Sequence, residues 1–315
     1  MIVKALNRVP ATRPPHALFC RIRNEDYFIP HFLAHYRQLG IDHFYFADDQ
    51  SDDGTREYLL AQDDCTVFGG DMRFSERIGD VQAKVVVARE VPEQVIGPGW
   101  TLTVDCDEFM VLPEPLKTIG DLTGFLEAKG QINCIAAMVD FYPKTLAERF
   151  ADRDVSPFLS FPFFDVGPYF IWSQGQQLPF LLYAGVRHRL NEWMVERDRG
   201  KVWQAYRPTI LQKVPLVKWG HGLLPEKNSH IANLPPYTGT QVALAHFKFY
   251  PDLDRKIDEA IESGHYQGNS YYYRLLKRYL PVFESRMLLA LVSRRYTTPN
   301  DLTSAHLMFV DGPPY

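Results

Sequence analysis

Short apolar runs alternate with stretches of helical periodicity over the first third of the chain. The runs that predict buried strands are Ala17–Ile22, His43–Phe46, Cys65–Phe68 and Trp100–Val104. Between them, apolar residues recur every three or four positions, as on the buried face of an amphipathic helix. These helices are expected at 30–39, 55–61 and 81–89. Strands and helices that alternate at this pitch predict parallel βαβ units and an α/β fold with a doubly wound sheet.

The pattern changes after Pro113. Mixed strands and loops are expected there, and the clearest strands are Ile132–Asp140 and Leu211–Trp219. From Pro251 onward the periodicity is helical, with helices expected at 251–264, 271–280 and 283–295. Residues 1–15 form a proline-rich lead-in. The simplest division is therefore one mixed α/β domain followed by a helical C-terminal extension.

Composition excludes several classes of protein. The 315 residues include 34 basic and 38 acidic side chains, a net charge of −4, so no overall basic field exists to hold nucleic acid. The four cysteines form no C-x-x-C pair, which favours reduced thiols over a zinc site or a disulfide framework. No apolar run is long enough for a signal peptide or a membrane span. A cytoplasmic protein is expected.

Polar clusters follow three of the predicted strands, at 23–26, 48–53 and 105–108. Ligands of open parallel sheets bind outside the carboxyl ends of the strands, although a single carboxylate there is more often a turn or helix cap. Asp105 and Asp107 lie two residues apart as an apolar strand ends, so both can point beyond the sheet edge. Paired carboxylates suit Mg²⁺ or Mn²⁺, which complete their coordination with phosphate oxygens.

Other nucleotide and metal motifs are absent. No G-x-G-x-x-G follows the first strand, and no P-loop sequence occurs. The segment from Asp49 to Gly54 resembles the start of an EF-hand loop, but Leu60 stands where that loop needs a glutamate. The carboxylate pair therefore implies a diphosphate ligand bound through a divalent ion, and an acidic turn before Phe109 and Pro113 is the structural alternative.

Three of these segments together resemble a known family. They are Arg23–Glu25, Leu39–Thr55 and Asp105–Phe109, the last reading D-C-D-E-F. They are similar to the family-two-like glycosyltransferases of the GT-A fold, in the group whose metal motif reads D-x-D-E-F. The similarity covers 16–113 and continues more loosely to about 250 through the segments 183–189, 213–216 and 244–248. It implies a GT-A domain at 16–250, with a nucleotide-binding half at 16–113 and an acceptor half at 114–250. The helical extension at 251–315 lies outside the similarity.

The resemblance also implies a donor site. Asp105 and Asp107 would hold Mn²⁺ or Mg²⁺, and His246 would complete the ligand set, with His221 and His230 as weaker alternatives. On composition alone His246 is more often a hydrogen-bonded core residue. Asp48 would contact the nucleoside of a nucleoside-diphosphate sugar, taken to be of the UDP type. Further donor-binding residues are expected to be Arg23, Asn24, Glu25, Asp53, Lys213 and Lys248.

The catalytic base is less clearly indicated. The resemblance favours an inverting transfer, which needs a carboxylate to accept the proton of the acceptor hydroxyl, but the family's usual downstream Glu-Asp motif is not evident. Asp140 and Asp165 are the candidates, and both could equally be turn residues. Arg187 and Arg189 could face the diphosphate, an acidic acceptor or solvent.

The expected function is transfer of a sugar to a saccharide or lipid-linked acceptor, in polysaccharide or glycolipid synthesis. A sugar nucleotidyltransferase is the nearest enzymatic alternative, and a non-catalytic nucleotide- or carbohydrate-binding module is the alternative from another class. Basic residues of the C-terminal helices could contact the inner face of a membrane, although a packed helical lid is the preferred interpretation. They are Arg274, Lys277, Arg278, Arg294 and Arg295.

Overall fold

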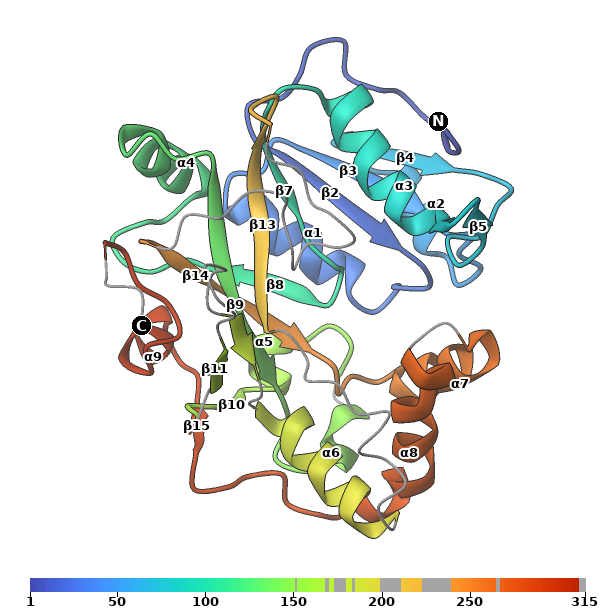
Figure 1. Cartoon of the computed structure of the whole chain (residues 1–315), viewed down its shortest axis with the longest axis vertical. Helices are drawn as coiled ribbons and strands as arrows, with labels where there is room; N and C mark the ends of the chain where they lie inside the picture. Colours follow the sequence, from blue (N-terminus) through green and yellow to red (C-terminus); the bar gives the residue numbers. More distant parts are fainter. Residues whose placement is uncertain are drawn as a thin grey trace. The chain divides into compact units, whose positions relative to one another are not determined.

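A computed structural model describes residues 1–150, 152–167, 170–172, 180–182, 185–198, 211–222, 239–264 and 267–311 (Figure 1). The chain forms two compact units. Unit 1 comprises Met1–Ala136, Lys213–Val242 and Met308–Tyr315, and unit 2 comprises Ala137–Gln212 and Ala243–Leu307. The mixed α/β class expected from the sequence is confirmed.

A nine-stranded sheet has the order β1-β4-β3-β2-β7-β13-β9-β14-β8. Its strands are β1 (Lys4–Ala5), β2 (Ala17–Ile22), β3 (His43–Asp48), β4 (Cys65–Gly69), β7 (Gly99–Thr103), β8 (Glu108–Val111), β9 (Asn133–Phe141), β13 (Gln212–Trp219) and β14 (Gln241–Phe247). The pairs β2–β3, β3–β4 and β2–β7 are parallel, whereas β1–β4 and β7–β13 are antiparallel. The chain therefore runs outward from β2 through β3 to β4 and returns to the other side of β2 at β7.

Helices cover both faces of this sheet in unit 1. They are α1 (Ile29–Gln38), α2 (Thr55–Leu60), α3 (Ala83–Glu90) with the π-helical turn Val91–Ile96, and α4 (Ile119–Ala128), and a short hairpin of β5 (Arg77–Ile78) and β6 (Val81–Gln82) precedes α3. On one face Phe32 of α1 packs on Phe46 of β3, with ring centroids 6.1 Å apart. On the other, Phe19 and Tyr45 share a core with Val87 of α3. Alternate strand residues thus meet helices on opposite faces, which is why the strands read as continuous apolar runs.

The four predicted strands of this half are confirmed, and so are the helices at α1 and α2. The third predicted helix begins later than expected, because Val81 and Gln82 form β6 and α3 starts at Ala83. After Pro113 the strands predicted at Ile132–Asp140 and Leu211–Trp219 are confirmed as β9 and β13, but the expectation of mixed strands and loops missed a helix. Helix α4 follows, and it begins with a capping box in which Thr118 and Asp121 each accept a hydrogen bond from the other's backbone N–H.

Unit 2 is built around three helices, α6 (Gly185–Arg197), α7 (Leu253–Ser263) and α8 (Gln267–Glu284). Its other elements are the 3₁₀ turn Leu146–Phe150, α5 (Pro157–Ser160), β10 (Phe163–Asp165), β11 (Phe170–Trp172), β12 (Phe180–Leu182), β15 (Ser293–Arg295) and α9 (Pro299–Ser304). Leu190 of α6, Ile257 of α7 and Leu276 of α8 belong to one buried cluster. Among the described residues no helix is both long and apolar enough to cross a membrane.

The C-terminal helices were predicted only in part. Helix α7 is confirmed, and α8 contains the predicted segment 271–280. The helix predicted at 283–295 was wrong, since α8 ends at Glu284 and Ser293–Arg295 pairs with β10 as a strand. Backbone groups there bond outside their own segment: the Leu288 N–H donates to the Lys144 carbonyl, and the Leu288 carbonyl accepts from Arg189. Such contacts are incompatible with an i to i−4 ladder.

The burial of His35 predicts that the free energy of unfolding depends on pH. A ring nitrogen of this half-buried side chain lies 2.8 Å from the Met110 carbonyl, and burial lowers the pKa of His35 to about 4. The unfolded chain takes up this proton near about pH 6.5 and the folded chain does not, so acid favours unfolding. Relative to His35→Gln, the wild type should lose roughly 1–2 kcal/mol of unfolding free energy between about pH 7.5 and about pH 5.

Urea unfolding of both proteins at the two pH values measures this difference. His221→Gln serves as the control because it removes another histidine, one that lies in an exposed turn. A pH-independent difference for His35→Gln would contradict the prediction.

Candidate functional site

The carboxyl ends of β2, β3 and β7 lie at one edge of the parallel part of the sheet, and each carries one of the polar clusters noted in the sequence. The chain reverses its direction of travel across the sheet between β2 and β7. In open α/β sheets this switch point is where ligands bind, because neighbouring loops turn away from each other there. The segments that flank it are 23–26 after β2 and 105–107 after β7.

Side chains bond the first two loops to each other. Asn24 accepts from the Asp52 N–H at 3.0 Å, and its own N–H donates to the Ser51 hydroxyl at 2.9 Å. Asp53 accepts from the N–H groups of Asp26 and Thr55 at 3.2 and 3.0 Å. These contacts fix the loop backbones, so Asn24 and Asp53 have a structural role whether or not a ligand binds.

The side chain of Asp48 is fully buried at the end of β3. One carboxylate oxygen accepts from the Ser51 N–H at 3.1 Å and the other from Arg56 Nε at 2.6 Å. Arg23 donates to the Asp49 carbonyl at 2.8 Å, which holds the same loop from the β2 side. The expected nucleoside contacts of Asp48 and Arg23 stay predictions, and so does the donor role of Glu25, whose N–H donates to Thr55 Oγ1.

A buried lysine joins the acidic motif to the neighbouring strand. Lys213 of β13 is only 2% exposed; its ammonium lies 2.9 Å from Asp105 Oδ2 and forms an ion pair with Glu108. The Asp105 N–H donates to the other Glu108 oxygen at 3.1 Å. Burial opposes the charge of Lys213, but the carboxylates of Asp105 and Glu108 overcome it and raise the pKa of the ammonium. Lys213 is therefore a permanent positive charge at the motif.

Asp105 differs from Glu108 in its exposure. The Asp105 side chain is 48% exposed, and its second oxygen lies 3.7 Å from Arg21, whereas Glu108 is buried. Burial raises the pKa of Glu108 to about 7, against the opposing effect of Lys213. Glu108 thus acts as an internal anchor for Lys213, and Asp105 is the carboxylate that a ligand can reach.

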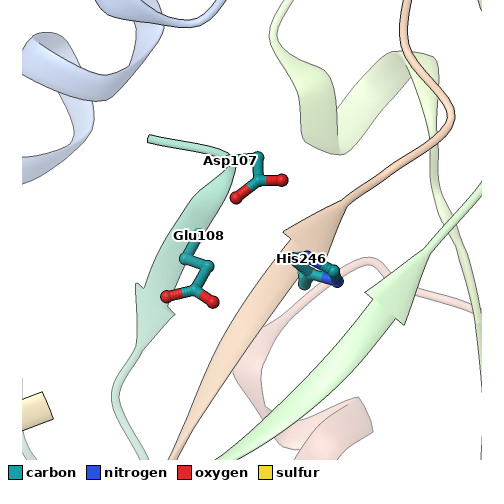
Figure 2. Close-up of side chains that lie close together, drawn as sticks. All are labelled: Asp107, Glu108 and His246. Atoms are coloured by element: carbon teal, nitrogen blue, oxygen red, sulfur yellow. The ribbon is translucent and has the colours of Figure 1, made fainter. Parts of the chain in front are cut away.

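Helix α1 positions the start of β8. The Tyr36 hydroxyl donates to the Glu108 carbonyl at 2.8 Å and accepts from the Met110 N–H at 3.0 Å. Figure 2 shows three side chains of the kinds that can bind a metal ion. Asp107 and Glu108 lie at the start of β8, and His246 lies on β14. Because Asp107 directly precedes an anchored strand, its backbone position is fixed by the same bonds.

In unit 2, His246 contacts a buried carboxylate. Its Nδ1 lies 2.6 Å from Asp140 Oδ1, and Arg187 Nε lies 2.8 and 2.7 Å from the two Asp140 oxygens. Burial would raise the pKa of Asp140, but Arg187 and His246 together lower it. An ionised carboxylate accepts, so the Nδ1 of His246 carries a hydrogen, and Nε2 is the nitrogen with metal-binding character.

Asp165 is part of a second buried ion pair. Arg189 Nε lies 2.9 Å from Asp165 Oδ2, and the hydroxyls of Tyr142 and Ser293 also bond this carboxylate. Arg187 and Arg189, which could have faced a diphosphate, are instead paired with the two candidate bases. The base roles of Asp140 and Asp165 remain untested predictions.

Three expected site residues remain to be placed. Lys248 follows β14 in unit 2. Its positive charge there partly opposes the rise that burial causes in the pKa of Tyr272. His221 lies in the exposed turn after β13 in unit 1. His230 lies outside the described residues.

Sequence reasoning missed the anchoring role of Glu108. The residue belongs to the D-C-D-E-F segment, but nothing in its spacing indicates that it pairs with Lys213, which lies 105 positions further along the chain. The only signal was a lysine at the start of a largely apolar predicted strand, since a lysine is rarely fully buried without a partner.

A comparison with models of protein families and with curated protein sequences finds no match for this chain. The inference of function therefore rests on the residues and their geometry.

The buried ion pair generates a prediction about stability. Lys213→Gln leaves Glu108 buried beside Asp105 with no cation, and breaking such a pair costs about 3–5 kcal/mol. Lys218 on the same strand provides a matched control because its partner is the half-exposed Glu127. Lys218→Gln should cost at most about 1 kcal/mol.

Urea unfolding measures both values. A second substitution, Glu108→Gln, should restore much of the stability of Lys213→Gln because it removes the buried carboxyl group that has lost its partner. Equal losses for the two lysine variants, or no recovery in the double variant, would show that the pair does not carry this role.

Proposed function

We propose that this protein is a metal-dependent glycosyltransferase of the GT-A type, which transfers a sugar from a nucleoside diphosphate to a saccharide or lipid-linked acceptor. One observation carries the proposal: Asp105 and Asp107 lie in the loop between β7 and β8, at the switch point of the parallel part of the sheet. That position is expected for the diphosphate of a nucleotide, and two carboxylates can hold it only through a cation.

The side chains proposed as metal ligands are of the kinds that bind Mn²⁺ or Mg²⁺. Asp105 and Asp107 offer hard oxygen ligands, and the proposal adds the imidazole of His246 as a further ligand. Asp105 is half-exposed and therefore open to a bound ion. When bound, the ion would stabilise the negative charge that develops on the departing diphosphate.

The protein's own residues have distinct roles in this proposal. Lys213 keeps a fixed positive charge beside Asp105, where it attracts the diphosphate. Asp140 holds the Nδ1 hydrogen of His246 and so presents Nε2; its pairing with Arg187 and its lowered pKa make it a weak base. Asp140 is therefore proposed as a positioning residue.

The remaining donor-binding residues are assigned to a UDP-type donor. Asn24, Asp48 and Asp53 would act by fixing the loops after β2 and β3, since the structure already places their side chains in bonds within those loops. Arg23, Glu25 and Lys248 are proposed to contact the donor itself. An inverting reaction remains part of the proposal, with a base still to be assigned.

One observation favours a second candidate function, a non-catalytic nucleotide- or carbohydrate-binding module. Both candidate bases, Asp140 and Asp165, lie in buried ion pairs with arginines. A carboxylate in such a pair is poorly suited to accept a proton. The same scaffold could then bind a nucleotide sugar without turning it over.

Thermal unfolding with UDP and Mn²⁺ tests the binding step. At a free nucleotide concentration of one hundred times Kd, binding stabilises the fold by about 2.7 kcal/mol, which raises Tm by roughly 5–10 °C. We expect this rise for the wild type only when UDP and Mn²⁺ are both present, and its loss in Asp107→Asn. Asp64→Asn is the matched control, because Asp64 lies on the surface and pairs with Arg37.

A rise without Mn²⁺, or an unchanged rise in Asp107→Asn, would contradict the metal assignment. Incubation with Mn²⁺ and a panel of UDP-sugars then separates the two functions. Released UDP indicates the transferase, and a metal-dependent Tm rise without any release indicates the binding module.

A further inference from the structure

The segment 285–295, which joins α8 to the end of β15, exposes both apolar and basic side chains. Leu291 is 97% exposed and Met287 is 56% exposed, the largest such values near this end of the chain. Three arginines of the segment are exposed as well, Arg286, Arg294 and Arg295. We refer to residues 285–295 as the arginine–leucine segment; Figure 1 shows it as an extended stretch leading to β15.

The exposure of Leu291 results from a well-defined turn. The Ser293 N–H donates to the Ala290 carbonyl at 3.0 Å, and the Ala290 N–H donates to Ser293 Oγ at 2.8 Å. Leu288 anchors the segment, since its side chain is buried and its N–H donates to the Lys144 carbonyl at 2.8 Å. Leu291 is therefore held outward at the tip of a fixed turn.

The charge of the segment is opposite to that of the whole protein. Positions 285–300 contain three arginines and no acidic residue, whereas the chain carries a net charge of −4. Within the described part of the chain, none of the three arginines forms an ion pair. Arg286 lies over the Trp193 ring at 4.9 Å, Arg295 lies 6.0 Å from the Phe163 ring, and Arg294 donates to the Leu291 carbonyl.

Two carboxylates next to the arginine–leucine segment are already paired. Glu284, at the end of α8, contacts Arg149 at 3.2 Å. Asp165 of β10, which is the strand paired with β15, is held by Arg189. The positive charge of the arginine–leucine segment is therefore not neutralised by these groups.

We infer that the arginine–leucine segment docks on an anionic lipid bilayer, with Leu291 and Met287 in the acyl boundary and the arginines at the headgroups. A few apolar side chains beside cations suffice for such binding, because basic residues near an anionic surface each strengthen it by roughly fivefold. A protein partner would need a larger complementary area, about 800 Å² on each side. The inference does not depend on the proposed transferase activity.

Co-sedimentation of the full chain with vesicles tests this inference. We expect binding to vesicles of phosphatidylcholine mixed with phosphatidylglycerol, weak binding to phosphatidylcholine alone, and a decrease as salt increases. Arg294→Gln with Arg295→Gln should weaken binding to the mixed vesicles roughly 25-fold. Leu291→Glu should also abolish most of it, because a carboxylate then faces the anionic surface.

Matched substitutions in unit 1 serve as controls. Leu60→Glu changes another exposed leucine, and Arg8→Gln with Arg77→Gln removes two other exposed arginines. Both should bind the vesicles as the wild type does, and so should Asp107→Asn, which separates this result from that of the metal site. Equal binding to both kinds of vesicle, or unchanged binding by the Leu291 and arginine variants, would overturn the inference.

Discussion

The ammonium of Lys213, buried between Asp105 and Glu108, is the interaction on which the candidate site depends. A buried charge is costly unless partners surround it, and here two carboxylates offset the loss of hydration. The bonds tie β13 to the loop after β7 and to the start of β8. They also leave Asp105 half-exposed at the switch point while Glu108 stays inside.

Polar residues at the strand ends have two different roles. Asn24, Asp48 and Asp53 fix the backbone of their own and neighbouring loops, whereas Asp105 and Asp107 lie where a ligand can bind. Side chains that cap turns rigidify the frame in which the other carboxylates are held. A site of this kind needs both, because a cation is bound tightly only when its ligands are already in position.

Much of the fold of residues 16–113 could be predicted from the sequence. Strands such as Ala17–Ile22 are buried on both faces, so their apolar runs are continuous and easily recognised. Helix α4 was missed although Thr118 and Asp121 form a capping box that the sequence contains. The segment 285–295 was assigned to a helix because its leucines suit one, but contacts of Leu288 with distant residues override that preference.

The candidate site was predictable only where its residues are close in the sequence. Asp105 and Asp107 could be recognised from their spacing after a predicted strand. The pairs Lys213–Glu108, Arg187–Asp140 and Arg189–Asp165 do not, because each is formed by folding and joins residues far apart in the chain. Arg187 and Arg189, which the sequence suggested as contacts of a diphosphate, instead form ion pairs with Asp140 and Asp165 of their own unit.

Electron paramagnetic resonance of Mn²⁺ tests the central claim most directly, because the signal of the free ion decreases when the ion binds. UDP by itself binds Mn²⁺, so each signal is compared with that of the same Mn²⁺ and UDP without protein. We predict that the wild type lowers the signal below this reference when UDP is present and removes little of the signal without UDP. Asp105→Asn and Asp107→Asn should leave the signal at the reference in both conditions. A further loss that is independent of UDP, or that persists in both variants, would contradict the assignment of these strand-end carboxylates to a metal–diphosphate site.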